Sequence, residues 1–145
     1  MGETDPTLGR LEDQINWYDH KSSYNRRMYK WLKGVEIIAA ALVPLSSGLR
    51  LPAALTGSMG VLIAVLEGLL QLNQYLQNGI TYRSTCESLK HEKFLYLAAA
   101  GPYATEDRPQ AHAKLAERVE SLVSQENSQW AALQERQAKP RETAP

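Results

Sequence analysis

Residues 35–49, VEIIAAALVPLSSGL, and residues 51–66, LPAALTGSMGVLIAVL, are two apolar stretches separated by one charge, Arg50, in an otherwise strongly polar chain. Each stretch is shorter than the roughly 20 residues of a spanning helix, but interfacial residues at 31–33 and 71–75 extend each to about 19 to 21. The pattern predicts membrane helices at 34–50 and 52–75, made antiparallel neighbours by the tight turn. The alternative is the buried core of a soluble helical bundle.

Basic residues flank the two stretches on the side away from the turn. They are Arg26, Arg27, Lys30 and Lys33 before the first stretch, and Arg83, Lys90 and Lys93 after the second. The turn holds only Arg50. Because positively charged loops stay on the cytoplasmic side of a membrane, both termini are predicted in the cytoplasm and the turn outside.

Apolar side chains recur at steps of three and four on both sides of the spans, which predicts further helices at 8–33, 76–100 and 109–136. The first runs directly into its span, the second ends at Gly101-Pro102, and the third starts at Pro109. The third carries an apolar side made of Leu115, Val119, Leu122, Val123, Trp130 and Leu133. The prediction is an all-α fold: one domain, 1–145, with a two-helix transmembrane hairpin whose helices extend into a cytoplasmic three-helix bundle, and with disordered ends.

Composition excludes several classes of function. The formal net charge is zero and no long run of one sign occurs, which argues against nucleic-acid binding. The single cysteine, Cys86, cannot form an intramolecular disulfide. No phosphate loop, nucleophile elbow or metal-ligand spacing is present, and His20, His91 and His112 lie on different predicted helices. We therefore expect no enzymatic activity, no cofactor and no metal.

Two acidic residues lie inside the apolar stretches. Glu36 and Glu67 are about equally far from the turn, so an antiparallel hairpin puts both carboxylates at one depth, near the cytoplasmic face. A charge there is costly and points to function, such as an acidic ring around the axis of a cation-conducting oligomer. The alternative is local pairing, Glu36 with Lys33 and Glu67 with Gln71.

Small polar and small apolar residues mark two further features of the spans. Thr56 and Ser58 are candidates to line the outer half of a pore, although such hydroxyls also bond their own helix carbonyls. A stripe of small residues follows one face of the second span. Its members are Gly57, Gly60, Ala64 and Gly68. In lipid such a stripe favours close helix packing, against the first span or against another copy of the chain.

A set of short motifs, in this order, resembles the bacterial SLATT superfamily. The motifs are Asn16-Trp17-Tyr18-Asp19 with Lys21-Ser22, Pro44, Glu67-Gly68, Tyr82-Arg83 with Glu87, Leu89-Lys90, Glu92-Lys93, Ala100-Gly101-Pro102-Tyr103, Arg118-Val119-Glu120, and Glu126 before Trp130. The resemblance covers about residues 8–136. It implies a homo-oligomer in the bacterial inner membrane whose cytoplasmic helices receive a signal, and a pore-forming effector role. We expect no sensor domain in this chain, so another protein or a small molecule would supply the trigger.

Charged residues of the flanking helices form a candidate ion-pair network if those helices run antiparallel. The candidates are Asp19, Lys21, Arg83, Glu87, Lys90 and Glu92. The same residues are the alternative place for a ligand. Two functions follow from the sequence: an ion-conducting or pore-forming homo-oligomer that prefers cations, or a membrane-anchored adaptor whose bundle recruits a cytoplasmic signalling partner.

Overall fold

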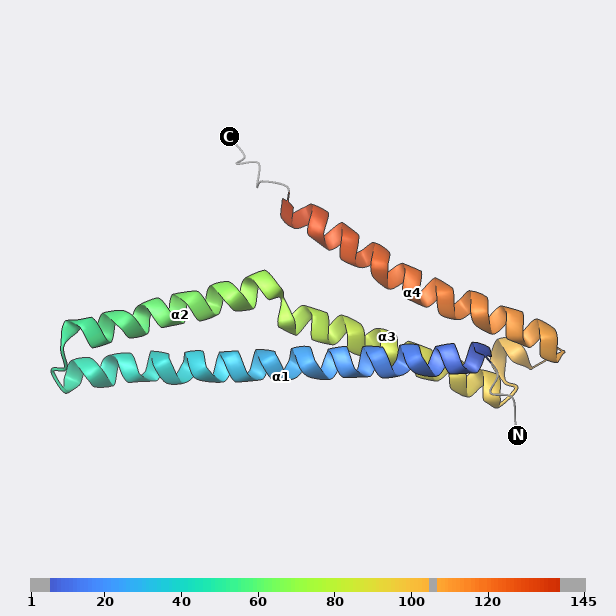
Figure 1. Cartoon of the computed structure of the whole chain (residues 1–145), viewed down its shortest axis with the longest axis horizontal. Coiled ribbons are helices and arrows are strands. Elements are labelled where there is room, and N and C mark those ends of the chain that lie inside the picture. The colour runs from blue at the N-terminus through green and yellow to red at the C-terminus, as the bar shows by residue number, and fades with distance from the viewer. Residues whose placement is uncertain (1–5, 105–106, 139–145) are drawn as a thin grey trace. The chain divides into compact units, whose positions relative to one another are not determined.

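The computed structural model describes residues 6–104 and 107–138, and this part of the chain is helical without strands, as predicted. The elements are α1 (Pro6–Gly48), α2 (Ala53–Asn73), α3 (Tyr75–Leu97), the short 3-10 helix η1 (Gly101–Tyr103) and α4 (Arg108–Ala138) (Figure 1). The chain divides into two compact units. The central unit is residues 20–82, and the terminal unit consists of residues 1–19 and 83–145. The predicted disordered ends lie mostly outside the described residues.

Helix α1 is continuous across the predicted helix at 8–33 and the predicted span at 34–50, as expected. Its buried positions follow the predicted steps of three and four from Leu11 to Asn25, at Leu11, Ile15, Tyr18, Ser22 and Asn25. Ala39 and Ser46 follow at multiples of seven residues, which keeps them on the same helix face. It starts at Pro6 because proline fits the first turn of a helix. It ends at Gly48, two residues before the predicted end, because Arg50 takes a left-handed conformation with φ 54°. The amide of Leu51 then donates to the carbonyl of Ser46 at 3.0 Å, which satisfies the helix end.

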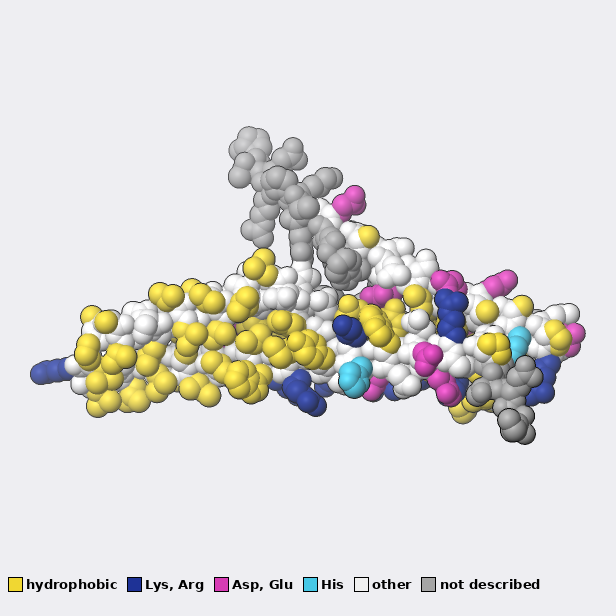
Figure 2. Space-filling model, viewed as in Figure 1, with side chains coloured by type: hydrophobic (Ala, Val, Ile, Leu, Met, Phe, Trp, Pro, Cys, Tyr) yellow, Lys and Arg dark blue, Asp and Glu magenta, His cyan; other side chains and the backbone are white. Residues whose placement is uncertain are grey.

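Within the central unit, α2 runs beside the second half of α1 in the opposite direction. The hydroxyls of Ser46 and Thr56 are 3.0 Å apart, and Lys33 Nζ donates to Glu67 Oε2 at 3.1 Å. Leu66 and Leu70 are buried, but most large apolar side chains of this unit are exposed. Yellow side chains cover the faces of α2 and the second half of α1 that are visible in Figure 2. By length and composition, Pro6–Gly48 and the segment Ala53–Tyr103 each contain a stretch that could cross a membrane.

The second span does not extend as one continuous helix into the segment 76–100, contrary to prediction. It breaks at Gln74, which has a left-handed conformation with φ 46° and ψ 38°. Leu70 before the break and Gly79 after it are both buried. Tyr75, which is half-buried, comes five residues after Leu70. In a regular helix residues five apart lie about 140° from each other. The break therefore turns the buried face of α3 back toward α1, where a Cβ on Gly79 would lie 3.0 Å from Arg26 Cγ.

Two asparagine side chains donate hydrogen bonds to backbone carbonyls near this break. Asn78 Nδ2 donates to the carbonyl of Asn73, and Asn73 Nδ2 donates to the carbonyl of Leu69, both at 3.0 Å. The amide of Gln74 still reaches the carbonyl of Leu70 at 3.1 Å. Neither proline nor glycine marks the break, so no strong local signal predicts it.

Gln74→Gly is expected to stabilise the protein by about 1 kcal/mol, because glycine adopts left-handed angles without the clash of a Cβ. The matched control is Gln77→Gly, an exposed position within α3, where glycine is expected to destabilise by about 0.5 to 1 kcal/mol. Thermal unfolding in detergent, followed by circular dichroism, checks both shifts. Equal losses in both variants would show that Gln74 is not strained.

The terminal unit has its core where three helices meet. Leu11 of α1, Leu89 of α3 and Leu115 of α4 are fully buried. Cys86 is also fully buried, and burial raises the pKa of its thiol. On α4, Val119 is buried while Leu122 and Val123 are half-buried; the side chains of Trp130 and Leu133 lie outside those described.

The connection between α3 and α4 differs from prediction in two places. Helix α3 ends at Leu97, because Ala99 rather than Gly101 is the first left-handed residue, with φ 47°. Gly101 is also left-handed, with φ 57°, and begins η1. Helix α4 starts at Arg108, one residue before the predicted start, because Asp107 caps it: its Oδ1 accepts the amide of Gln110 at 3.0 Å.

Candidate functional site

Glu36 and Glu67 come together through one lysine. Lys33 Nζ donates to both oxygens of Glu36 at 3.0 Å and to Glu67 Oε2 at 3.1 Å. Gln71 Nε2 donates to Glu67 Oε1 at 3.2 Å. The Glu36 side chain is 14% exposed and that of Glu67 is 43% exposed. Both local pairs expected from the sequence are thus present, and one lysine brings the two carboxylates together. We call this group the Lys33 cluster; it has a formal net charge of −1.

The two hydroxyl candidates have partners within the chain. Thr56 shares a hydrogen bond with Ser46, and Ser58 Oγ donates to the carbonyl of Leu55 at 2.8 Å. Thr56 is half-buried and Ser58 is exposed. Of the two, only Ser58 lies on a surface of α2 that is open in the single chain.

The small-residue stripe does not pack against α1. No heavy atom lies within 4 Å of a Cβ built on Gly57, Gly60 or Gly68, apart from neighbouring residues and the helix's own backbone. Ala64 is exposed as well. The face that α2 turns toward α1 instead carries large side chains, among them Leu66 and Leu70. Within the single chain the stripe is therefore an open surface.

Four of the network candidates form one cluster in the terminal unit. Arg83 lies 3.2 Å from Asp19 and 2.6 Å from Glu87, and Lys90 lies 3.8 Å and 3.5 Å from the same two carboxylates. All four side chains are about half-exposed, so each pair contributes little to stability. The fifth candidate, Lys21, lies in the central unit, where its carbonyl accepts Asn25 Nδ2 at 2.8 Å.

Glu92, the sixth candidate, belongs to a different and more buried cluster. Its carboxylate accepts Arg118 Nε at 2.9 Å and Arg118 Nη2 at 2.6 Å, and it accepts the hydroxyl of Tyr103 at 2.8 Å. The Glu92 side chain is only 7% exposed. The guanidinium of Arg118 lowers the pKa of Glu92, while burial and the neighbouring carboxylate raise the pKa of Tyr103. Both partners were missing from the predicted network.

Aromatic contacts extend this cluster along α3 and α4. The rings of Tyr96 and Tyr103 meet edge to face, with centroids 5.6 Å apart. The hydroxyl of Tyr96 is hydrogen-bonded to His112 Nδ1. Through Tyr103 and Arg118, Glu92 on α3 binds both η1 and α4. The role of Glu92 is therefore structural: it stabilises the connection between α3 and α4.

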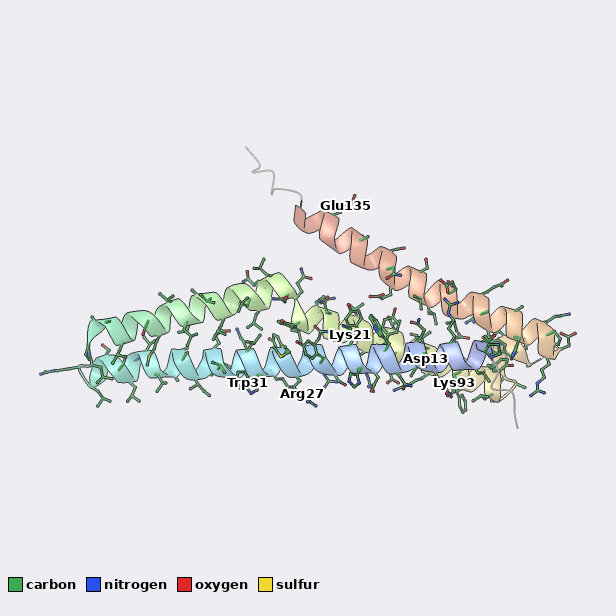
Figure 3. All side chains as sticks on the ribbon, viewed as in Figure 1. Asp13, Lys21, Arg27, Trp31, Lys93 and Glu135 are labelled. Atoms are coloured by element: carbon green, nitrogen blue, oxygen red, sulfur yellow. The ribbon has the colours of Figure 1, made fainter. Side chains whose placement is uncertain are left out.

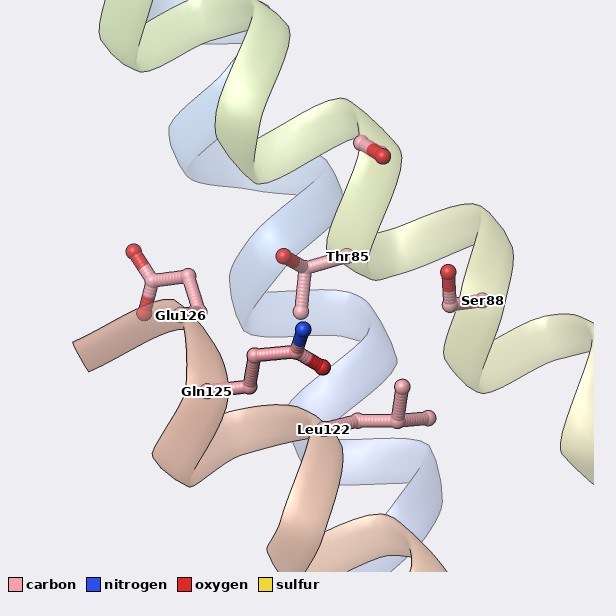
Figure 4. Close-up of a pocket in the computed structure, with 6 residues that line it drawn as sticks. Thr85, Ser88, Leu122, Gln125 and Glu126 are labelled. Carbon is pink, nitrogen blue, oxygen red and sulfur yellow. The ribbon is translucent and has the colours of Figure 1, made fainter. Parts of the chain in front are cut away.

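A polar pocket of about 170 Å³ lies between α3 and α4 (Figure 4). Its lining consists of Ser84, Thr85, Ser88, Leu122, Gln125 and Glu126. The side chains of Thr85 and Gln125 point toward each other across it. Glu126 is buried and accepts the hydroxyl of Tyr18 at 3.2 Å. Because no basic side chain lines the pocket, it does not suit a phosphate group.

No group of three histidine, cysteine, aspartate or glutamate residues among those described is arranged to hold a metal ion. The sequence model of a family described as "Protein of unknown function (DUF4231)" matches residues 13–111. No curated protein and no solved structure matches the chain. The matched region includes the Lys33 cluster and the cluster of Asp19, Arg83, Glu87 and Lys90, but ends before Arg118 and Glu126.

Proposed function

The chain belongs to the DUF4231 family, and from that premise and the geometry above we propose that it is an integral membrane protein whose α1 and α2 cross the bilayer as a hairpin. One observation carries the proposal: only 11% of the residues in each apolar window are buried within the chain. The core helices of a soluble protein are mostly buried, because exposed apolar surface is costly in water. Lipid is the solvent that suits these helices.

The exposed side chains on both helices support this proposal. Ile37 and Ile38 on α1 are at least 60% exposed, and Val61 and Leu72 on α2 are 66% and 84% exposed. No part of the central unit covers them. Both termini then lie in the cytoplasm, because the basic residues flank the open end of the hairpin and the turn holds only Arg50.

Self-association is the second part of the proposal. The open stripe at Gly57, Gly60 and Gly68 allows the backbone of another copy to approach closely. Copies arranged around an axis would place one Lys33 cluster each at the cytoplasmic mouth. The net charge of −1 per copy and the half-exposed Glu67 favour cations there. The resemblance to the SLATT superfamily agrees with such a pore-forming effector.

Ion flux through liposomes that contain the purified full chain tests conduction. We expect a cation-selective flux that falls several-fold, or loses its cation preference, in Glu67→Gln and Glu36→Gln. The matched control is Glu117→Gln, an exposed carboxylate of α4, which is expected to leave the flux unchanged. Liposomes that stay silent with the wild-type chain under all ionic conditions would contradict conduction.

The alternative is a membrane-anchored adaptor, which one observation favours: Lys33 already holds both carboxylates. In that case the spans only anchor, and the terminal unit recruits a cytoplasmic signalling partner. Replacement of residues 34–75 by an unrelated two-span hairpin would then preserve partner capture. Conduction instead requires that this replacement abolish the flux.

A further inference from the structure

Three closely spaced basic residues on α1 have no acidic partner among the described residues. Arg26, Arg27 and Lys30 are exposed, and none forms an ion pair within the described chain. The central unit, whose residues are all described, contains only two carboxylates, Glu36 and Glu67. Both are bound to Lys33. The positive charge of Arg26, Arg27 and Lys30 is therefore left for something outside the chain.

Exposed aromatic side chains accompany these cations on α1. Tyr24 is 56% exposed and Trp31 is 70% exposed. Arg27 and Trp31 are one helical turn apart and project from the same side of α1 (Figure 3). Residues seven apart share a helix face, so the row continues with Ile38, which is 63% exposed, and Leu45, which is 55% exposed. One outward face thus changes from basic and aromatic to purely apolar along α1.

We propose that Arg26, Arg27 and Lys30 bind the phosphate groups of anionic lipids, with Tyr24 and Trp31 lying among the headgroups. The inference rests on the proposed membrane insertion and names the lipid class that the cytoplasmic end selects. The three cations lie four to eight residues before Gly34, which is roughly 6 to 12 Å along the helix. That distance places Lys30 in the headgroup layer, and it places Arg26 and Arg27 within about a Debye length of that layer.

The geometry favours a lipid surface over a free anion. The three cations follow one another along a helix rather than converging on one point, and the surface that bears them continues without a break into exposed apolar side chains. Tryptophan and tyrosine prefer the membrane interface because one end of each ring system is apolar and the other is wet. Basic residues next to a span are attracted by the negative leaflet.

Fluorescence quenching at Trp31 tests the inference in the full chain. A Trp17→Phe and Trp130→Phe background leaves Trp31 as the only tryptophan. The protein is placed in phosphatidylcholine bilayers that contain a minority of either phosphatidylglycerol or phosphatidylcholine with a nitroxide near the headgroup. We expect the anionic quencher to be preferred, and the preference to fall by roughly five-fold for each of Arg26→Gln, Arg27→Gln and Lys30→Gln. High salt should weaken it.

Arg50→Gln is the matched control, because it removes one cation from the opposite end of the hairpin and is expected to leave the preference intact. Equal quenching by both lipids in the wild-type chain, or an unchanged preference in the triple variant, would overturn the inference while membrane insertion stands. Absence of quenching by either lipid would overturn insertion and the inference together.

Discussion

Arg118→Met is expected to destabilise the terminal unit by about 3 kcal/mol at neutral pH, because it leaves the buried carboxylate of Glu92 without its cation. Methionine keeps most of the apolar stem, so loss of packing contributes little. The half-exposed Arg118 places the effect at the low end of the range for buried pairs. A loss of this size lowers the melting temperature by roughly 6 to 12 °C, measurable by circular dichroism in detergent.

The pH dependence of the stability loss in Arg118→Met tests whether the unpaired charge of Glu92 causes it. Arg118 lowers the pKa of Glu92 below its ordinary value of 4.5, so this pair stabilises the fold above that pH and its contribution is lost as the pH falls through the lowered folded pKa. In Arg118→Met, burial acts alone and raises the pKa of Glu92. The difference in the free energy of unfolding between Arg118→Met and the wild type should therefore become smaller as the pH is lowered from neutral.

Two further variants separate the buried charge from other causes. Glu92→Gln combined with Arg118→Met should be more stable than Arg118→Met alone, because no ionised group is left unpaired. Arg10→Met is the matched control: it breaks the pair of Arg10 and Glu120, whose side chains are 70% and 63% exposed, and should change the melting temperature little. A double variant less stable than Arg118→Met would contradict the assignment.

Val61→Arg is expected to reduce membrane insertion by about 100-fold, because an arginine near the centre of a span costs roughly 2.5 to 3.5 kcal/mol. Val61 lies near the middle of α2 and is 66% exposed. The expectation separates two accounts: on a soluble protein an exposed valine can become arginine with almost no effect. The inserted fraction, measured with a cell-free translocation reporter, checks it.

The matched control for this substitution is Leu97→Arg, at the end of α3. The exposed fraction of Leu97, 62%, is similar to that of Val61, but Leu97 lies outside the proposed spans. It should insert like the wild type. Equal insertion of both variants would mean that α2 does not lie in lipid.

The sequence predicted much of the helical pattern because that pattern depends on spacing alone. The predicted steps of three and four on α1 are its buried side from Leu11 to Asn25. Counting residues to the turn predicts that Glu36 and Glu67 lie side by side, and Lys33 binds both of them. Such features need no knowledge of distant contacts.

Features that depend on distant contacts were missed. The break at Gln74 lacks glycine and proline, and it follows from the need of Gly79 to face α1. The partnership of Glu92 with Arg118 crosses a connection whose path the sequence does not reveal. The cap at Asp107 is different: an aspartate two residues before a proline is a recognisable helix start and could have been found.

Alkaline carbonate extraction of membranes that contain the unmodified chain tests the central claim most directly. Peripheral proteins leave the membrane under this treatment, whereas spanning helices stay until detergent dissolves the bilayer. The hairpin account predicts that the chain remains in the pellet and enters the supernatant only with detergent. Release by carbonate as a monodisperse, detergent-free species would contradict it.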